Sequence, residues 1–313
     1  MRRLSSRTNT AVSHRRVVFH LPRSPALRIG KARASTGSPA CLMRSCFSPK
    51  SKPVGFDSSR EISVITREAG SGTRDAFTEL AGVLVKQDGK KKDNTTLEAL
   101  TIDGTQGVMS TVAGNEYAIG YISLGSLNNT VKALQIDGVS ADKLNVKRGT
   151  YPIARPFNIA FKGKVDEVTQ DFIDFIMSAD GQAIVDANGY VSVNEGKPYQ
   201  SKNLKGKIVI AGSSSVSPVM EKLKEAYEAK NQNVQIEIQT NDSSSGMLAA
   251  KEGTCNIGMA SRDLKASEKE VLTSLTIARD GIAVIVNNKN PQTNLSKETL
   301  RQIYTGLIRN WKI

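Results

Sequence analysis

Three times in this chain an apolar, strand-like run passes into a turn rich in serine and glycine and then directly into a helical segment. The turns occupy residues 70–73, 212–215 and 241–246. From Glu61 onward strands and helices alternate, a pattern typical of an α/β architecture with a largely parallel sheet. This repetition is the strongest constraint on the fold, and it predicts an α/β protein.

The spacing of apolar residues predicts the extent of the main elements. Short apolar or alternating runs predict strands at 62–65, 117–122, 207–211 and 234–238. Helical spacing predicts a helix after residue 73 that extends through Leu84, a helix over 165–177, and helices from Pro218 and from Met247. Residues 194–206 are polar and contain Gly and Pro, so we expect a linker there.

Each of the three turns is a potential anion site. The first N–H groups of a helix lack partners within the helix, glycine allows the backbone to approach a ligand, and the helix dipole favours negative charge. Further donors would be the hydroxyls of Ser71, Thr73, Ser214, Ser215, Ser243 and Ser244. One such turn is weak evidence because Ser and Thr are also common helix caps. Three turns, with Arg67 just before one of them, favour a site for a tetrahedral oxyanion.

The chain has few groups from which an active site could be built. Both histidines lie within the first 20 residues, and Cys255 is the single cysteine after residue 46. A His- or Cys-built metal site or a Ser-His-Asp triad is therefore not expected. The turns also lack the glycine frames of nucleotide-binding loops and nucleophile elbows. We expect no catalytic residue, metal or cofactor; a phosphatase-like pocket around Arg67 would lack a general base.

The positive charge of the chain is concentrated in its first 60 residues. These hold thirteen Lys and Arg against the single acid Asp57, whereas the remainder has thirty basic and twenty-nine acidic residues. We therefore expect no nucleic-acid binding by the nearly neutral body. No apolar run approaches the length that a membrane-spanning helix needs.

Residues 1–58 mix Arg, Ser, Pro and Thr without periodicity, which predicts a disordered basic tail. Its role is open between a segment without function, a transit peptide, an anionic-surface or nucleic-acid binder, and a secretory signal. A secretory signal is the weakest of these, because the apolar run 17–19 is interrupted by His20. A lipoprotein site at Ser45-Cys46 is equally unconvincing, because Arg44 stands where a small residue is needed.

Two groups of motifs carry a resemblance to a known family. One group is formed by residues 67–77, which read Arg-Glu-Ala-Gly-Ser-Gly-Thr-Arg-Asp-Ala-Phe, and 118–123; the other is formed by 211–215, 242–246, 257–262 and 303–311. The first group resembles the second half of bacterial PstS-type phosphate-binding proteins, the substrate-binding components of phosphate ABC transporters. The second group resembles their first half. Together the resemblance covers about 61–193 and 206–313.

The resemblance implies a two-lobed, type II periplasmic-binding-protein-like fold with its halves in reversed order. Residues 59–193 would be the family's C-terminal half, 194–206 a linker, and 207–313 the N-terminal half. Either the chain is a circular permutant that folds alone, or it is a slice through a tandem array. Single domains tolerate permutation, which favours the first explanation.

The resemblance also implies a function and a set of ligand residues. Phosphate would bind between the lobes to Arg67, Ser71, Gly72, Thr73, Ser214, Ser215 and Ser243. Many members have Asp at the position of Ser261, where a carboxylate can accept the proton of HPO4 and help to reject sulfate. Ser261 accepts only weakly, so strict selectivity is not implied.

The family context implies an extracytoplasmic monomer that serves the membrane subunits of an ABC transporter. Two alternatives stay open. The chain could bind another tetrahedral oxyanion, such as sulfate or a molybdate-like ion. It could also be a non-functional fragment of a tandem phosphate-binding protein.

Overall fold

The structure is a computed structural model that describes residues 55–87 and 90–313. The predicted disordered tail, residues 1–58, therefore lies almost entirely outside the described residues. Within the described ranges, no helix combines the length and apolar character that crossing a membrane requires.

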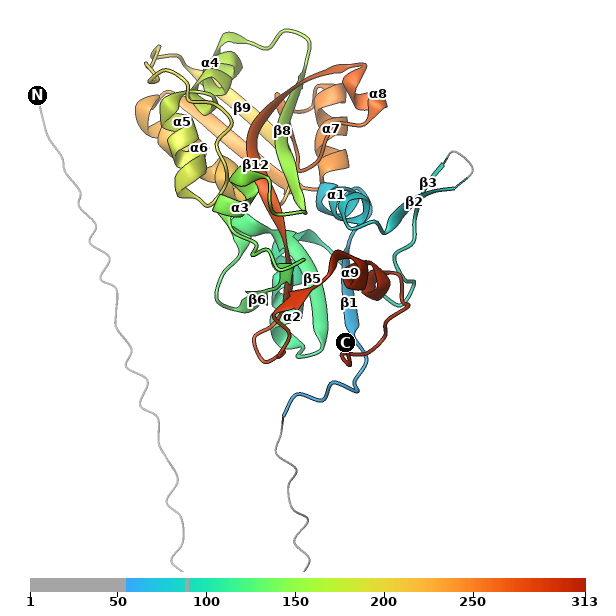
Figure 1. Cartoon of the computed structure of the whole chain (residues 1–313). Coiled ribbons are helices and arrows are strands. Elements are labelled where there is room, and N and C mark those ends of the chain that lie inside the picture. The colour runs from blue at the N-terminus through green and yellow to red at the C-terminus, as the bar shows by residue number, and fades with distance from the viewer. Residues whose placement is uncertain (1–54, 88–89) are drawn as a thin grey trace, which may run out of the picture. The chain divides into compact units, whose positions relative to one another are not determined.

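Two lobes, each with its own hydrophobic core, make up the described part of the chain (Figure 1). The core of the first lobe draws on residues 62–153, Val191 and 282–311, and that of the second on 157–190 and 208–278. The second lobe is thus inserted between two segments of the first. The chain passes from one lobe to the other along β8 (Ala154–Lys162) and returns along β12 (Leu272–Asn287).

The first lobe contains the following larger elements: β1 (Ser63–Arg67), α1 (Gly72–Leu80), β4 (Leu100–Ile102), α2 (Gly104–Gly114), β5 (Ala118–Ser123), β6 (Val131–Ala133), α3 (Lys143–Arg148) and α9 (Lys297–Tyr304). Its smaller elements are β2 (Leu84–Gln87), β3 (Lys90–Asp93), η1 (Leu124–Ser126), β7 (Gln135–Ile136) and β13 (Asn294–Leu295). Figure 1 shows β2 and β3 projecting as a hairpin.

The second lobe contains α4 (Glu167–Ile176), α5 (Ala179–Ala187), β9 (Gly206–Ser213), α6 (Ser217–Lys230), β10 (Val234–Asn241), α7 (Ser243–Glu252), β11 (Ile257–Ala260) and α8 (Ala266–Lys269). The segment between α5 and β9 that includes the expected linker has no helix or strand after Val191.

The main sheet has the order β10-β9-β11-β8-β12-β5-β1-β4. Its ends are parallel, with β9 paired to β10 and β11, and β1 paired to β4 and β5. In the middle, β8 and β12 are antiparallel to their neighbours. The expectation of a largely parallel sheet was therefore wrong. The sheet is mixed because the two strands that connect the lobes run in opposite directions.

Two predicted helix boundaries were also wrong. The helix expected to extend through Leu84 ends at Leu80, since Gly82 has a φ of +74° and redirects the chain into β2. The helix expected from Met247 begins four residues earlier, at Ser243. There the carboxylate of Asp242 caps α7 by accepting a hydrogen bond from the Ser245 amide.

Residues near the two ends of the described range meet in the first lobe. The Ile62 amide donates to the Arg309 carbonyl at 2.8 Å, and the Trp311 indole N–H donates to the Tyr117 carbonyl at 3.1 Å. Trp311 is buried in the same core as β1 and β5. The last residues therefore complete the lobe that β1 begins.

Candidate anion-binding site

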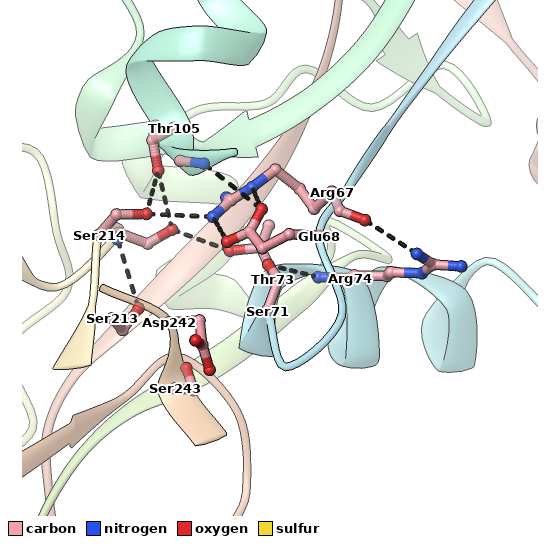
Figure 2. A network of polar contacts seen from close by, with 12 residues as sticks. Arg67, Glu68, Ser71, Thr73, Arg74, Thr105, Ser213, Ser214, Asp242 and Ser243 are labelled. Carbon is pink, nitrogen blue, oxygen red and sulfur yellow. Dashed lines mark hydrogen bonds and ion pairs between the residues drawn. The ribbon is translucent and has the colours of Figure 1, made fainter. Parts of the chain in front are cut away.

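Arg67, the last residue of β1, lies with its guanidinium between the lobes (Figure 2). Its side chain is 2% exposed. Nε and Nη2 donate to the Glu68 carboxylate, each at 2.7 Å, and Nη2 also donates to Ser214 Oγ across the lobes at 3.1 Å. Nη1 is buried and has no hydrogen-bond partner among the described residues. Leaving a buried donor without a hydrogen-bond partner costs free energy. An acceptor that bound to Nη1 would remove this cost.

The turn after Arg67 brings the N-terminus of α1 against the second lobe. Gly70 has a φ of +88°, and Ser71 then caps the helix by accepting from the Arg74 amide at 3.3 Å. Thr73 Oγ1 lies 2.8 Å from Ser215 Oγ. A Cβ on Gly72 would lie 2.3 Å from Ser243 Oγ, so only glycine permits this approach of the two lobes.

The second lobe contributes serines from three loops. Ser213 ends β9, Ser215 lies between β9 and α6, Ser243 begins α7, and Ser261 follows β11. Ser213 Oγ donates to Ser261 Oγ at 2.9 Å, and the Ser261 amide donates to Ser243 Oγ at 3.1 Å. All four serines are buried. The loops are thus linked into one wall of hydroxyl groups.

The structure brings the residues predicted from the sequence to one place. Arg67 contacts Ser214, Thr73 contacts Ser215, and Gly72 faces Ser243 and Ser261. The hydroxyl of Ser71 accepts at the helix cap and retains its own proton to donate.

Thr105 is a polar residue of the site that was not predicted from the sequence. It lies at the N-terminus of α2, and its Oγ1 is 3.3 Å from Ser214 Oγ and 3.2 Å from Ser215 Oγ. It belongs to a fourth unit in which a strand passes through a turn into a helix, since β4 precedes Asp103-Gly104. The signal in the sequence was the pair Gly104-Thr105 after a short apolar run. This signal is weak because β4 has only three residues.

The electrostatics favour an anion although the site has little net charge. The N-termini of α1, α2, α6 and α7 all meet at the linked hydroxyls, and each directs the positive end of a helix dipole toward them. Glu68 balances the charge of Arg67. Among the described residues, no group of three or more His, Cys, Asp or Glu could hold a metal ion. The arrangement can bind an oxyanion through many neutral donors and one cation.

A cavity of about 560 Å³ borders the site where Thr105 and Ser214 form part of its lining. The linked hydroxyls are therefore next to space that reaches solvent on the side of α2 and α6.

Comparison with known proteins gives consistent matches over most of the chain. The model of the PBP superfamily domain matches residues 52–180 and 197–313. The chain is 50% identical over 253 residues to phosphate-binding protein PstS 2 of Streptococcus agalactiae, covering 80% of this chain and 86% of the relative. It is 47% identical over 276 residues to PstS 2 of Streptococcus pneumoniae, covering 88% and 93%.

A solved structure agrees with these matches. The crystal structure of a phosphate-binding protein of a phosphate ABC transporter from Streptococcus pneumoniae is 49% identical and superposes with a TM-score of 0.66. The match covers 80% of this chain and 98% of that one.

Proposed function

We propose, since this chain belongs to the PstS-type family of phosphate-binding proteins, that it binds inorganic phosphate between its two lobes. It would act as the substrate-binding component of a phosphate ABC transport system. The relatives are named as binding proteins, and we propose no catalytic step for this chain.

One observation carries the proposal. The Nη1 group of Arg67 is buried, without a partner in the described part of the chain, at a point where hydroxyls from both lobes and four helix N-termini converge. A tetrahedral oxyanion has enough acceptor lone pairs to satisfy this guanidinium and several hydroxyl and amide donors at once. We assign the phosphate contacts to the residues predicted from the sequence and add Thr105: Arg67, Ser71, Gly72, Thr73, Thr105, Ser214, Ser215, Ser243 and Ser261.

The transport role is supported by the relatives. The similar protein from Streptococcus pneumoniae is described as part of a phosphate ABC transporter. By that relationship we propose an extracytoplasmic location and membrane subunits of such a transporter as partners.

Calorimetry and thermal denaturation test the ligand. A ligand present at 100 times its Kd stabilises the folded state by about 2.7 kcal/mol. Protein dialysed free of phosphate should therefore gain several degrees in Tm with phosphate and fewer with sulfate. Equal shifts would mean that Ser261 gives no discrimination based on the phosphate proton, and a larger shift with molybdate would favour the alternative oxyanion. No shift with any of the three would contradict the proposal.

We also propose that both halves of the site belong to one self-contained module with a permuted order of halves. The hydrogen bond between Arg67 and Ser214, which are 147 positions apart, supports a site formed within a single chain. Light scattering of residues 59–313 should give a monomer that binds one phosphate. An obligate dimer or an insoluble product would favour a slice of a tandem array, because unpaired apolar faces would be left exposed.

A further inference from the structure

A buried ion pair lies where the chain passes between the lobes. Arg155 on β8 and Asp280 on β12 are direct partners in the antiparallel register. The Nη2 and Nε groups of Arg155 donate to Asp280 Oδ2 at 3.1 and 3.3 Å, and the two side chains are 1% and 0% exposed. Replacing such a pair by apolar residues is often neutral for stability, so its presence suggests another role.

The third hydrogen bond of Arg155 reaches the candidate site. Its Nη1 group donates to the backbone carbonyl of Ser261 at 3.0 Å. On its other side, Ser261 is held by its amide, which donates to Ser243 Oγ, and by its hydroxyl, which accepts from Ser213. Arg155 therefore fixes the backbone of the residue to which two other loops of the site are tied.

The neighbouring carbonyl is held from the same strand. Asn158 Nδ2 donates to the Arg262 carbonyl at 2.9 Å, while its Oδ1 accepts from Thr276 Oγ1 on β12 at 2.7 Å. Both peptide carbonyls that follow β11 are thus engaged by side chains of β8, and each of these side chains is anchored on β12. The loop has no regular structure of its own to hold it in this position.

We propose that Arg155, anchored by Asp280, is a positioning residue that fixes the Ser261 loop and thereby sets the affinity of the anion site without contacting the anion. The part of this inference that concerns affinity rests on the proposed function. Because Asp280 neutralises the charge of Arg155, the contribution of Arg155 is the placement of Ser261 and not a second positive charge at the ligand.

The test uses the full chain with Arg155→Met combined with Asp280→Asn, so that no unpaired charge is left buried. Arg155→Lys provides a second variant, since one ammonium group cannot reproduce the forked contact with both Asp280 and the Ser261 carbonyl. Asp171→Asn is the matched control. Asp171 is also a fully buried carboxylate of the second lobe, but it is bound to Tyr199, Tyr227 and Lys202.

Two readouts are measured well below Tm: the Kd for inorganic phosphate by calorimetry, and hydrogen exchange of the peptide 257–264 in the absence of ligand. We expect the double variant to raise Kd by about fivefold or more and to speed exchange in this peptide, with Arg155→Lys intermediate. The Asp171→Asn control should leave both unchanged even if its Tm falls.

The two readouts separate the inference from the proposed function. If the parent does not bind phosphate but exchange at 257–264 still rises in the double variant, the proposed function fails and the positioning of the loop stands. If exchange is unchanged, the inference is overturned whatever the ligand is. Faster exchange with an unaltered phosphate Kd would overturn the link to affinity, and so would an equal rise in Kd with Asp171→Asn.

Discussion

The hydroxyls of Thr73 and Ser215 lie 2.8 Å apart although they belong to different lobes and are 142 positions apart in the chain. Thr105 reaches the same serine at 3.2 Å. The lobes therefore touch at the candidate site itself, and a ligand that binds between them has to enter while they are separated. The contacts between the lobes therefore contribute to the affinity for the ligand, in addition to the contacts that the ligand itself makes.

Arg67 should contribute more to phosphate binding than any single hydroxyl. A hydrogen bond to a charged group contributes roughly 1.5–3 kcal/mol, so Arg67→Ala should raise Kd by at least about tenfold in calorimetry. Ser71→Ala should cost less, because neighbouring amides and hydroxyls compensate. Arg301→Ala, which removes a partly exposed arginine from α9, is the control. Binding by Arg67→Ala with the parent's Kd would place the site elsewhere.

Gly72→Ala should impair binding by keeping the lobes apart. The added Cβ would lie 2.3 Å from Ser243 Oγ and 2.9 Å from Ser261 Oγ, closer than atoms pack without displacement. We expect Kd to rise by about tenfold or more while the ligand-free Tm changes little. Gly114→Ala, at a helix position with open space around it, should leave Kd unchanged. Equal Kd values for the two variants would show that the close approach is not needed.

Asp75 should support the closed arrangement from outside the site. Its Oδ2 lies 3.0 Å from Arg262 Nε and 3.4 Å from Lys265 Nζ, across the lobes. Since Asp75 is partly exposed, Asp75→Asn should raise the phosphate Kd by roughly two- to fivefold, and less so in high salt. Glu225→Gln, which removes a surface ion pair within α6, provides the control. A salt-independent effect would speak against an ion pair between the lobes.

Asp280 should make stability depend on pH in an unusual direction. Burial raises its pKa to about 6, against the attraction of Arg155; Tyr151, Tyr190 and Arg67 are the other ionisable groups nearby. Because its pKa is higher in the folded state, its contribution to stability is full below pH 4 and is lost as pH rises through 6.

The measurement is thermal denaturation of the parent and of Asp280→Asn at a series of pH values. The Tm of the parent relative to the variant should fall between pH 4 and pH 6.5, because the variant cannot take up this proton. Tyr151 and Tyr190 do not titrate between pH 4 and pH 6.5, since burial raises the pKa of each phenol above its ordinary, already alkaline value. A constant difference in Tm across the window would contradict the raised pKa.

The sequence was sufficient for the parts of the site that depend on local pattern. The Ser- and Gly-rich turns predicted that helices follow at α1, α6 and α7, although α1 and α7 begin inside their predicted turns. Their motifs predicted the family, which the comparisons confirm. Thr105 was missed because a three-residue strand leaves almost no periodic signal. The permuted order of the halves stays a prediction.

Features that depend on distant pairing could not be predicted from the sequence. No strand was predicted from the sequence at β8 or β12, and local spacing does not give the direction of a strand within a sheet, so the antiparallel centre of the sheet was missed. Arg155 and Asp280 are 125 positions apart, and nothing near either residue indicates a partner. Contacts of this kind depend on the topology by which the chain connects the two lobes. The local spacing of apolar residues does not encode that topology.

The insertion of the second lobe within the first has a consequence for biosynthesis. As the chain leaves the ribosome, β1, β4 and β5 appear early, but β12 and α9, which cover them, appear after the whole of the second lobe. The second lobe can therefore collapse while the first still exposes an unpaired β5 edge and an open core, a state prone to association with other nascent chains. The lobe that is begun first is therefore the one that is finished last.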